Sequence, residues 1–374
     1  MAVIGIVGLG VMGLGIAQVY AAAGHEVLLA DAYAPARETA AQRIRDGLAP
    51  RVAVGKLPVD AMEALLARLK VVKISGLAPC DLVIEAIAEK LEAKQALFAA
   101  VEAVTDAALA TNTSSLSVAA IAAGLKRPDR LVGLHFFNPA PVMKLVEFIT
   151  LPGTDPQAAA LARSLTEQAG KVVIACADTP GFIVNRCARP YYGEALALME
   201  EGRNPGEIDA AMVAAGYRLG PFQLIDLVGA DINLAATESL QAAMGGSPRY
   251  HIFPALRAQV TRGDLGRKTG RGFVYPDPLP EAPADAAAIV LRIEAMLANE
   301  AATLLAEGGS TMTGIDTALE LGLNFPRGPF ESGRRHGRSA ILTELLRLEA
   351  AAPGDLKPRY AICPALGPAL QSPL

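Results

Sequence analysis

The opening segment, residues 3–23, constrains the fold of this chain more than any other stretch. An apolar run rich in β-branched residues, 3–7, leads directly into the motif Gly8-Leu9-Gly10-Val11-Met12-Gly13, and helix-forming residues follow. In a strand, glycine loop and helix of this kind, Gly8 permits a tight turn, Gly10 lets the backbone approach a pyrophosphate and Gly13 allows close packing. The phosphates would lie at the helix N-terminus, beside Val11 and Met12. The segment predicts a dinucleotide-binding βαβ unit.

An acidic residue follows the second expected strand. That strand covers 26–30 and ends at Asp31. A carboxylate there accepts hydrogen bonds from a ribose 2′-OH and repels a 2′-phosphate. The sequence therefore predicts NAD rather than NADP.

A long helical segment at 35–70 then interrupts the alternation of strands and helices. It is rich in Ala, Arg and Leu, and we expect breaks at Pro50 and Gly55. The segment is longer than a βαβ crossover needs. Two interpretations stay open: a solvated helical pair, or an arm that contacts a long substrate, with Arg51 and Lys56 available for phosphates.

Strand-like runs resume at 71–74, 81–85, 108–111 and 131–134. Together with the first two strands they predict an α/β fold of the Rossmann type, with a doubly wound, mostly parallel sheet. Ligands of such sheets bind at the carboxyl ends of the strands. Those ends carry Glu85, then Asn112 to Ser115, then His135.

His135 and Glu147 are the candidates for acid–base chemistry. His135 ends one apolar run, Glu147 lies inside the next at 145–149, and a proline-broken loop separates them, so the two side chains can converge. A carboxylate behind an imidazole sets its tautomer, and such a pair removes the hydroxyl proton during hydride transfer. The alternatives are ordinary structural roles: a core histidine for His135, a helix cap for Ser114, and a turn cap for Asn185.

Composition and charge narrow the class of protein. A net charge of −4 does not favour binding to nucleic acid or to an anionic membrane. No apolar run reaches transmembrane length. The start of the chain lacks the features of a targeting leader, so a cytoplasmic protein is expected. The four cysteines lack metal-type spacing, which favours buried thiols over a disulfide framework or a zinc site.

The second half of the chain reads as a helical domain and its copy. Thr179-Pro180-Gly181 is typical of a loop, and after it helices are expected at about 182–201, 205–216 and 224–244. Four segments then recur 106 to 108 positions later: 183–186 at 289–292, 194–195 at 300–301, 208–209 at 315–316 and 220–222 at 328–330. The pattern predicts a duplicated domain, divided by a linker at 276–283. The copy has Leu291 where the first domain has Asn185.

Seven segments together resemble the NAD-dependent L-3-hydroxyacyl-CoA dehydrogenases, including 3-hydroxybutyryl-CoA dehydrogenases. They occur in the order typical of that family: 8–18, 83–94, 111–117, 133–147, 178–186, 220–231 and 266–273. The resemblance implies a Rossmann domain over 1–180 with the arm at 35–70, a helical C-terminal domain over 181–276, and a degenerate second copy over 284–374.

The same resemblance implies roles for individual residues. His135 is implied to be the catalytic base, Glu147 its orienting carboxylate, and Ser114 and Asn185 the substrate contacts. The cofactor would meet the glycine loop and Asp31, and its nicotinamide end would meet Glu89, Lys94, Asn112 and Asn138. Lys56 is a tentative CoA contact. Lys90, beside Glu89, departs from the Asn that relatives often carry there.

The expected activity is the reversible NAD-dependent oxidation of (S)-3-hydroxyacyl-CoA to 3-oxoacyl-CoA. A dicarboxylic substrate such as 3-hydroxyadipyl-CoA is an option. The alternatives are a dehydrogenase of the same build that acts on a hydroxy acid without CoA, and a non-catalytic NAD-binding structural protein. The protein is expected to be a homo-oligomer, or a pseudo-dimer in which the copy replaces a partner subunit.

Overall fold

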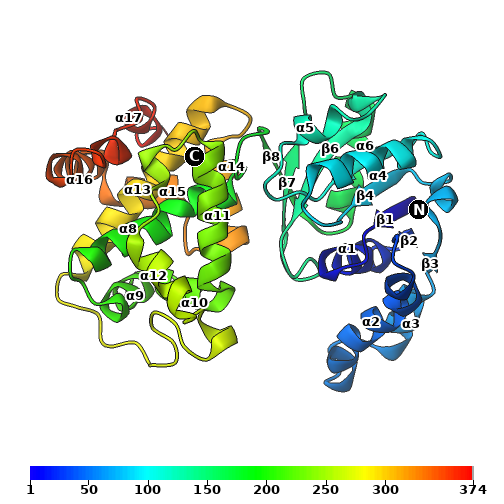
Figure 1. Cartoon of the computed structure of the whole chain (residues 1–374), viewed down its shortest axis with the longest axis horizontal. Coiled ribbons are helices and arrows are strands. Elements are labelled where there is room, and N and C mark those ends of the chain that lie inside the picture. Colours follow the sequence, from blue (N-terminus) through cyan, green and yellow to red (C-terminus); the bar gives the residue numbers. More distant parts are fainter. Residues whose placement is uncertain (373–374) are drawn as a thin grey trace. The chain divides into compact units, whose positions relative to one another are not determined.

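A computed structural model describes residues 1–372 of the chain, which divides after Thr179 into two compact units. The first unit is built on one sheet of eight strands (Figure 1). The sheet order is β3-β2-β1-β4-β5-β6-β7-β8. The strands are β1 (Val3–Val7), β2 (Glu26–Ala30), β3 (Leu69–Val71), β4 (Leu82–Glu85), β5 (Ala108–Thr111), β6 (Leu131–Phe136), β7 (Leu145–Ile149) and β8 (Val172–Cys176).

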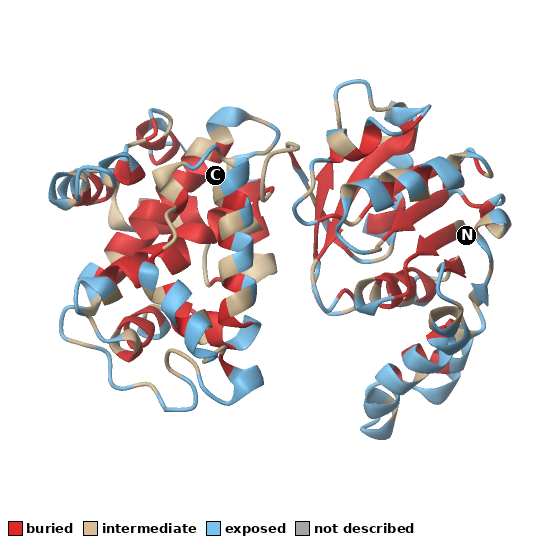
Figure 2. Ribbon diagram, in the orientation of Figure 1, coloured by how far each residue is buried: buried red, intermediate tan, exposed pale blue. Residues whose placement is uncertain are grey.

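The sheet is parallel except at one junction. β6 and β7 are antiparallel, and β8 is parallel to β7. The central strands β4 to β7 are buried along their whole length, which Figure 2 shows as red arrows. Burial on both faces explains why these strands are continuous apolar runs in the sequence. The Rossmann-type α/β fold predicted from the sequence is confirmed, but the strand expected over 71–74 lies at Leu69–Val71, and Ile74 begins a 3₁₀ turn.

Helices cover the faces of this sheet and form the arm. They are α1 (Val11–Ala22), α2 (Ala34–Ala53), α3 (Val59–Leu66), α4 (Leu91–Glu102), α5 (Val118–Ala122) and α6 (Pro156–Gln168), with short 3₁₀ turns at Ile74–Leu77 and Pro128–Arg130. The expected break at Pro50 is wrong: Pro50 lies inside α2, in its last turns. A proline this close to the end of a helix removes one backbone hydrogen bond, and Ile44 and Leu48 are buried on the turns before it.

The second unit is helical. Its helices are α7 (Val184–Cys187), α8 (Arg189–Glu200), α9 (Pro205–Ala214), α10 (Pro221–Val228), α11 (Ala230–Ala243), α12 (Pro254–Arg262), α13 (Ala286–Glu307), α14 (Met312–Leu323), α15 (Pro329–His336), α16 (Arg338–Ala351) and α17 (Leu366–Ala369). Three 3₁₀ turns lie at Pro248–Tyr250, Arg267–Thr269 and Lys357–Tyr360. The helix expected over 224–244 is in fact two, because Gly229 at φ 110° separates α10 from α11.

The same local device occurs twice in this unit. The carboxylate of Asp209 accepts hydrogen bonds from the backbone N–H groups of Phe222 and Gln223, at 2.9 and 2.6 Å. The carboxylate of Asp316 does the same for Phe330 and Glu331, at 2.8 and 3.0 Å. Each aspartate thus satisfies the first N–H groups of a helix that begins with Pro, α10 in one case and α15 in the other.

Three further findings concern the described residues. None of their helices combines the length and the apolar character that crossing a bilayer requires. Cys80, Cys176, Cys187 and Cys363 are all buried free thiols. No group of three or more His, Cys, Asp or Glu side chains within residues 1–372 is arranged to hold a metal ion.

Candidate active site

His135 and Glu147 face each other across two neighbouring strands. The register of β6 and β7 pairs the two residues directly, and Nδ1 of His135 lies 2.6 Å from Oε2 of Glu147. Glu147 is fully buried and His135 is 6% exposed. Because a carboxylate accepts hydrogen bonds, Nδ1 carries the proton and Nε2 keeps its lone pair. The predicted convergence of the two side chains is confirmed, and Nε2 is the atom that can take a further proton.

A neighbouring ring restricts the imidazole further. The ring of Phe137 lies 4.5 Å from that of His135, centroid to centroid, at an interplanar angle of 51°. Phe137 follows β6 directly, where the chain leaves the sheet. The imidazole is therefore held by a hydrogen bond on one side and by an aromatic contact on another, which fixes the direction of Nε2.

The glycine loop has the geometry that a pyrophosphate needs. Gly8 has φ 97°, and a Cβ there would lie 2.6 Å from the carbonyl oxygen of Ala86. A Cβ on Gly13 would lie 1.7 Å from the carbonyl oxygen of Gly8, so only glycine allows this helix-to-strand contact. At Gly10 a Cβ would meet no protein atom within 4 Å, and no side chain caps α1 there. The N–H groups of Val11 and Met12 thus begin a helix beside open space, which fits a dinucleotide phosphate.

Asp31 is fixed next to this loop. Its Oδ2 accepts a hydrogen bond from the backbone N–H of Leu9 at 2.7 Å, and its Oδ1 accepts one from Tyr33 at 2.8 Å. The carboxylate at the end of β2 is therefore tied to the glycine loop at the end of β1. This arrangement places an acidic group where the adenosine ribose of a dinucleotide lies in Rossmann folds.

The other predicted cofactor contacts of the first unit lie in three loops and one helix, with Glu89 in the loop between β4 and α4. Oδ1 of Asn112 accepts a hydrogen bond from the N–H of Phe136 at 2.8 Å, which joins the ends of β5 and β6. Asn138 is exposed in the loop between β6 and β7. Lys94 lies on α4 with only 1% of its side chain exposed, and its Nζ contacts Glu85 at 2.6 Å and Glu89 at 3.1 Å.

Two further predicted residues belong to other parts of the chain. Asn185 belongs to the second unit, where it is half-buried on α7, and its contact with the substrate stays a prediction. Just before it, Phe182 is buried with φ 48°, a backbone conformation rare for a residue with a side chain. Lys56 is exposed between α2 and α3.

The sequence analysis missed two residues that shape the loops of the site. Nζ of Lys171 donates hydrogen bonds to the carbonyl oxygens of Ala140 and Met143, at 2.5 and 2.8 Å, and so holds the loop that carries Asn138. Asp178 accepts hydrogen bonds from Ser117 Oγ and from two N–H groups at the start of α5. Lys171 gave no sequence signal, whereas Asp178 begins a segment already quoted for its family resemblance.

Comparisons with protein families and curated proteins agree with this geometry. Residues 3–179 match the NAD-binding domain of 3-hydroxyacyl-CoA dehydrogenase, and residues 181–275 and 289–367 both match its C-terminal domain. The chain is 48% identical over 276 residues to the 3-hydroxyadipyl-CoA dehydrogenase of Escherichia coli, a match that spans 72% of this chain and 58% of that protein. It is 39% identical over 275 residues to the 3-hydroxybutyryl-CoA dehydrogenase of Bradyrhizobium diazoefficiens, a match that spans 94% of that protein.

Solved structures extend the similarity to the full chain. The crystal structure of 3-hydroxybutyryl-CoA dehydrogenase from Escherichia coli aligns with a TM-score of 0.89 at 34% identity, over 99% of this chain and 98% of that one. The (S)-3-hydroxybutyryl-CoA dehydrogenase of Ralstonia eutropha aligns over 73% of this chain with a TM-score of 0.69 at 36% identity. The glycine loop, the buried His135–Glu147 pair and both domain matches lead to one conclusion: this chain belongs to the 3-hydroxyacyl-CoA dehydrogenase family.

Proposed function

We propose that the chain catalyses the reversible NAD-dependent oxidation of (S)-3-hydroxyacyl-CoA to 3-oxoacyl-CoA, with His135 as the general base. The observation that carries this proposal is the buried hydrogen bond between His135 and Glu147 at the carboxyl end of β6. The same sheet edge carries the glycine loop and Asp31, so a base and a dinucleotide site belong to one unit.

The proposed proton transfer follows from the tautomer. NAD, when bound at the glycine loop and Asp31, would supply the acceptor for the hydride of C3. Nε2 of His135 takes the proton of the C3 hydroxyl, so the alcohol becomes a ketone and the imidazole becomes an imidazolium. Glu147, on the other side of the ring, stabilises that positive charge. Ser114 and Asn185 would hold the hydroxyl and carbonyl region of the substrate for the transfer.

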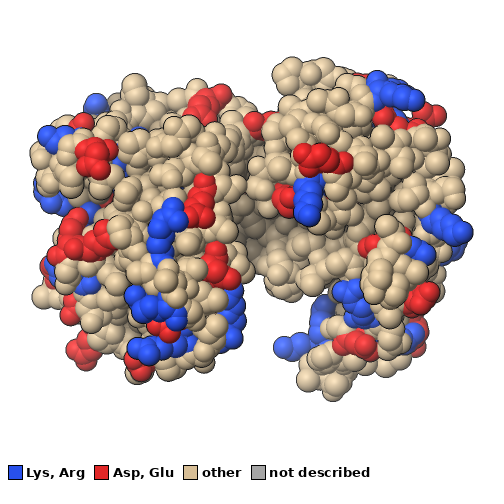
Figure 3. All heavy atoms as spheres, viewed as in Figure 1, with Lys and Arg blue, Asp and Glu red and all other residues tan. Residues whose placement is uncertain are grey.

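The arm formed by α2 and α3 is the proposed contact for CoA. Figure 3 shows Lys and Arg side chains over this segment, which includes Arg37, Arg43, Arg45, Arg51 and Lys56. Arg43 also donates a hydrogen bond to the carbonyl oxygen of Leu9, so the arm is attached to the glycine loop. Cationic side chains favour a phosphate-bearing thioester over a free hydroxy acid. Relatives named for 3-hydroxybutyryl-CoA and for 3-hydroxyadipyl-CoA leave short-chain and dicarboxylic substrates as the two options.

We further propose that the second helical copy acts as an internal partner of the first. Arg186, Glu194 and Glu201 recur 106 positions later as Arg292, Glu300 and Glu307. Nε of Arg186 lies 2.7 Å from Glu300, and Nε of Arg292 lies 2.9 Å from Glu194. The arginine of each copy therefore contacts the equivalent glutamate of the other copy. Such reciprocal contacts are characteristic of an interface with two-fold symmetry.

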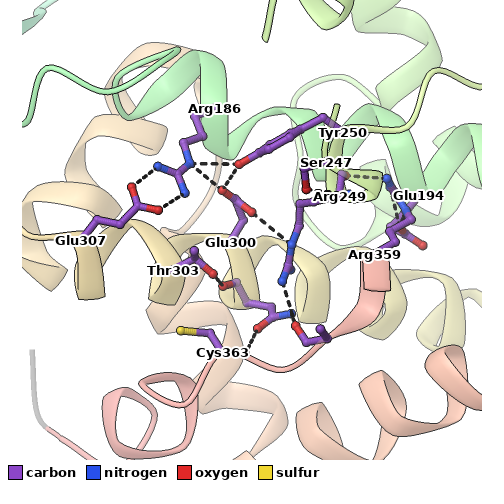
Figure 4. A network of polar contacts seen from close by, with 12 residues as sticks. Arg186, Glu194, Ser247, Arg249, Tyr250, Glu300, Thr303, Glu307, Arg359 and Cys363 are labelled. Atoms are coloured by element: carbon purple, nitrogen blue, oxygen red, sulfur yellow. Dashed lines mark hydrogen bonds and ion pairs between the residues drawn. The ribbon is translucent and has the colours of Figure 1, made fainter. Parts of the chain in front are cut away.

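The reciprocity extends to the remaining atoms of both guanidinium groups. Arg186 binds both oxygens of Glu307, and Arg292 binds both oxygens of Glu201. Tyr250 donates a hydrogen bond to Glu300 at 2.6 Å, close to the bound Arg186 in Figure 4. These contacts support a pseudo-dimer within one chain. Light scattering tests it: we expect a mass near 38.8 kDa, whereas a stable dimer through the helical unit would contradict the proposal.

The expected cytoplasmic location stays a prediction, which cell fractionation would test. The division into three domains is likewise a proposal, with boundaries near residues 180 and 276–283. Limited proteolysis should cut first within the linker at 276–283, where the structure has neither helix nor strand.

The oxidation of NADH in the presence of acetoacetyl-CoA tests the proposed function. His135→Ala should lower kcat by roughly 10²- to 10⁴-fold, since a positioned base is lost, and NADH binding should persist. His251→Ala, a histidine of the other unit, is the control and should keep the wild-type rate. Equal rates for wild type and His135→Ala would refute the assignment of the base. A wild type that binds NADH and reduces neither acetoacetyl-CoA nor longer or dicarboxylic thioesters would refute the substrate class.

A further inference from the structure

We propose that Glu89 is a positioning residue, which holds the loop at residues 112–117 so that Ser114 meets the substrate. This inference rests on the proposed function, because it assigns to Glu89 an effect on a substrate contact. Its basis is the convergence of several hydrogen bonds on one carboxylate oxygen.

Oε1 of Glu89 accepts hydrogen bonds from three consecutive residues of the loop. The hydroxyl of Thr113 donates at 2.5 Å and the backbone N–H of Ser114 at 2.9 Å. Ser115 donates both its backbone N–H and its hydroxyl, each at 3.1 Å. Ser114 itself is exposed at the surface of the unit. One carboxylate oxygen thus binds Ser114 itself and the residues on both sides of it.

The carboxylate is held in turn by Lys94. Nζ of Lys94 contacts Oε2 of Glu89 at 3.1 Å and Oε1 of Glu85 at 2.6 Å. Glu85 ends β4, and its Oε2 accepts a hydrogen bond from the hydroxyl of Thr111, the last residue of β5. The sheet, α4 and the loop are therefore joined in one polar chain whose centre, Lys94, is only 1% exposed.

The charge of Glu89 matters to this arrangement. Burial by itself would raise the pKa of Glu89. The hydrogen bond from Thr113, the charge of Lys94 and the N–H of Ser114 outweigh burial and lower the pKa to about 2. An ionised carboxylate accepts from several donors at once, and charge-assisted hydrogen bonds are the stronger kind. A glutamine would instead turn its NH₂ group toward the ammonium of Lys94 or toward the loop amides, which are themselves donors.

A direct contact with the cofactor is the competing role for Glu89. The geometry favours positioning, because both carboxylate oxygens already bind groups of the protein, Oε1 the loop and Oε2 the ammonium of Lys94. A cofactor contact through the same oxygens would have to compete with these bonds. The two roles differ in what they predict for NADH affinity.

A double-mutant cycle separates these roles. The variants are Glu89→Gln, Ser114→Ala and the two combined, assayed with NADH and acetoacetyl-CoA. Glu89→Gln should lower kcat/KM by about 10-fold or more, and should leave the Kd of NADH within about 2-fold of wild type. In the Ser114→Ala background, Glu89→Gln should lower kcat/KM by less than about 2-fold, because the Ser114 hydroxyl that Glu89 positions is absent. Glu92→Gln, an exposed carboxylate of α4, is the matched control and should change neither quantity.

Equal losses from Glu89→Gln in both backgrounds would overturn the inference, and so would a loss that appears mainly as weaker NADH binding. Amide hydrogen exchange provides a readout that does not depend on the substrate. The N–H groups of Ser114 and Ser115 should exchange faster in Glu89→Gln than in Glu92→Gln. Unchanged exchange would refute the positioning role even if the enzyme proved to act on another substrate. If Glu89→Gln does not fold, Ser115→Ala, which removes one donor to Oε1, should give the same pattern with a smaller effect.

Discussion

At the scale of single residues, the hydrogen bond between His135 and Glu147 contributes to the stability of the fold and is central to the proposed chemistry. A carboxylate without any solvent exposure is costly unless a donor satisfies it, and Nδ1–H of His135 is such a donor at 2.6 Å. The same bond assigns the proton between the two groups to Nδ1, and in the proposed reaction Nε2 takes the proton of the substrate hydroxyl. Loss of this bond would remove that donor from a fully buried carboxylate, so the geometry of the pair and the stability of the sheet depend on each other.

A second carboxylate, that of Glu89, makes stability depend on pH. The pKa of Glu89 is lowered from 4.5 to about 2, so its ionised form stabilises the folded state above about pH 4.5, and this stabilisation is lost as the pH falls toward 2. Glu89→Gln should therefore be less stable than wild type near neutral pH, and the difference should shrink below pH 4.5. Urea unfolding of both proteins at several pH values measures this. For Glu92→Gln the difference from wild type should be small at every pH, and a constant deficit for Glu89→Gln would contradict the prediction.

At the scale of elements, the short helix α5 depends on a residue far along the chain. Asp178 accepts hydrogen bonds from the N–H groups of Val118 and Ala119 and from the hydroxyl of Ser117, at 2.7 to 2.9 Å. Asp178→Ala should lower the free energy of unfolding by about 0.5 to 2 kcal/mol, as the loss of a helix cap does. Asp106→Ala is the control, because its side chain is 97% exposed and its change should lie within about 0.5 kcal/mol of wild type. Equal stability of the two variants would show that α5 does not need the cap.

The sequence predicts those elements that depend on local patterns, and it fails for features that depend on contacts between distant residues. The glycine loop and the buried strands have strong local patterns, and the convergence of His135 with Glu147 followed from two apolar runs joined by a short loop. The break between α10 and α11 at Gly229 was missed, because one glycine inside a helical pattern is compatible with an unbroken helix. The burial of Lys94 was also missed, because a lysine three residues into an amphipathic helix normally faces solvent. Its position depends on Glu85 and Glu89, which only the folded sheet edge brings together.

At the scale of the whole molecule, the duplication visible in the sequence becomes an internal interface in the second unit. The repeats predicted two similar helical segments, but no local pattern indicated that the arginine of each copy binds the glutamates of the other. α13 packs against helices of both copies, α8 and α9 of the first and α15 and α16 of the second. A helix in that position must be buried on most sides, which agrees with its long apolar sequence and its many buried residues.

The two arginines of this interface should differ in what their removal costs, although their own contacts match. Removal of one partner of a buried ion pair costs about 3 to 5 kcal/mol, because the other charge is left uncompensated. In Arg292→Met, Glu194 keeps Arg359 at 2.7 Å. In Arg186→Met, Glu300 keeps the hydrogen bond from Tyr250, but the cation that stays beside it, Arg249, is more distant at 3.6 Å. Arg186→Met should therefore be the less stable variant in urea unfolding.

The comparison of unfolding free energies needs a control substitution in an ion pair that joins the two copies at the surface. Arg203 and Asp285 form such an ion pair, with 38% and 46% of their side chains exposed, so Arg203→Met should cost at most about 1 kcal/mol. If both interface variants unfold as readily as Arg203→Met, the buried pairs do not hold the copies together, and the second copy is not an internal partner. If Arg292→Met is instead the less stable of the two, the residual pairing with Arg359 does not compensate Glu194, and the asymmetry of the interface has another cause. Light scattering on both variants then shows whether a loosened copy lets two chains associate, as a displaced internal partner would.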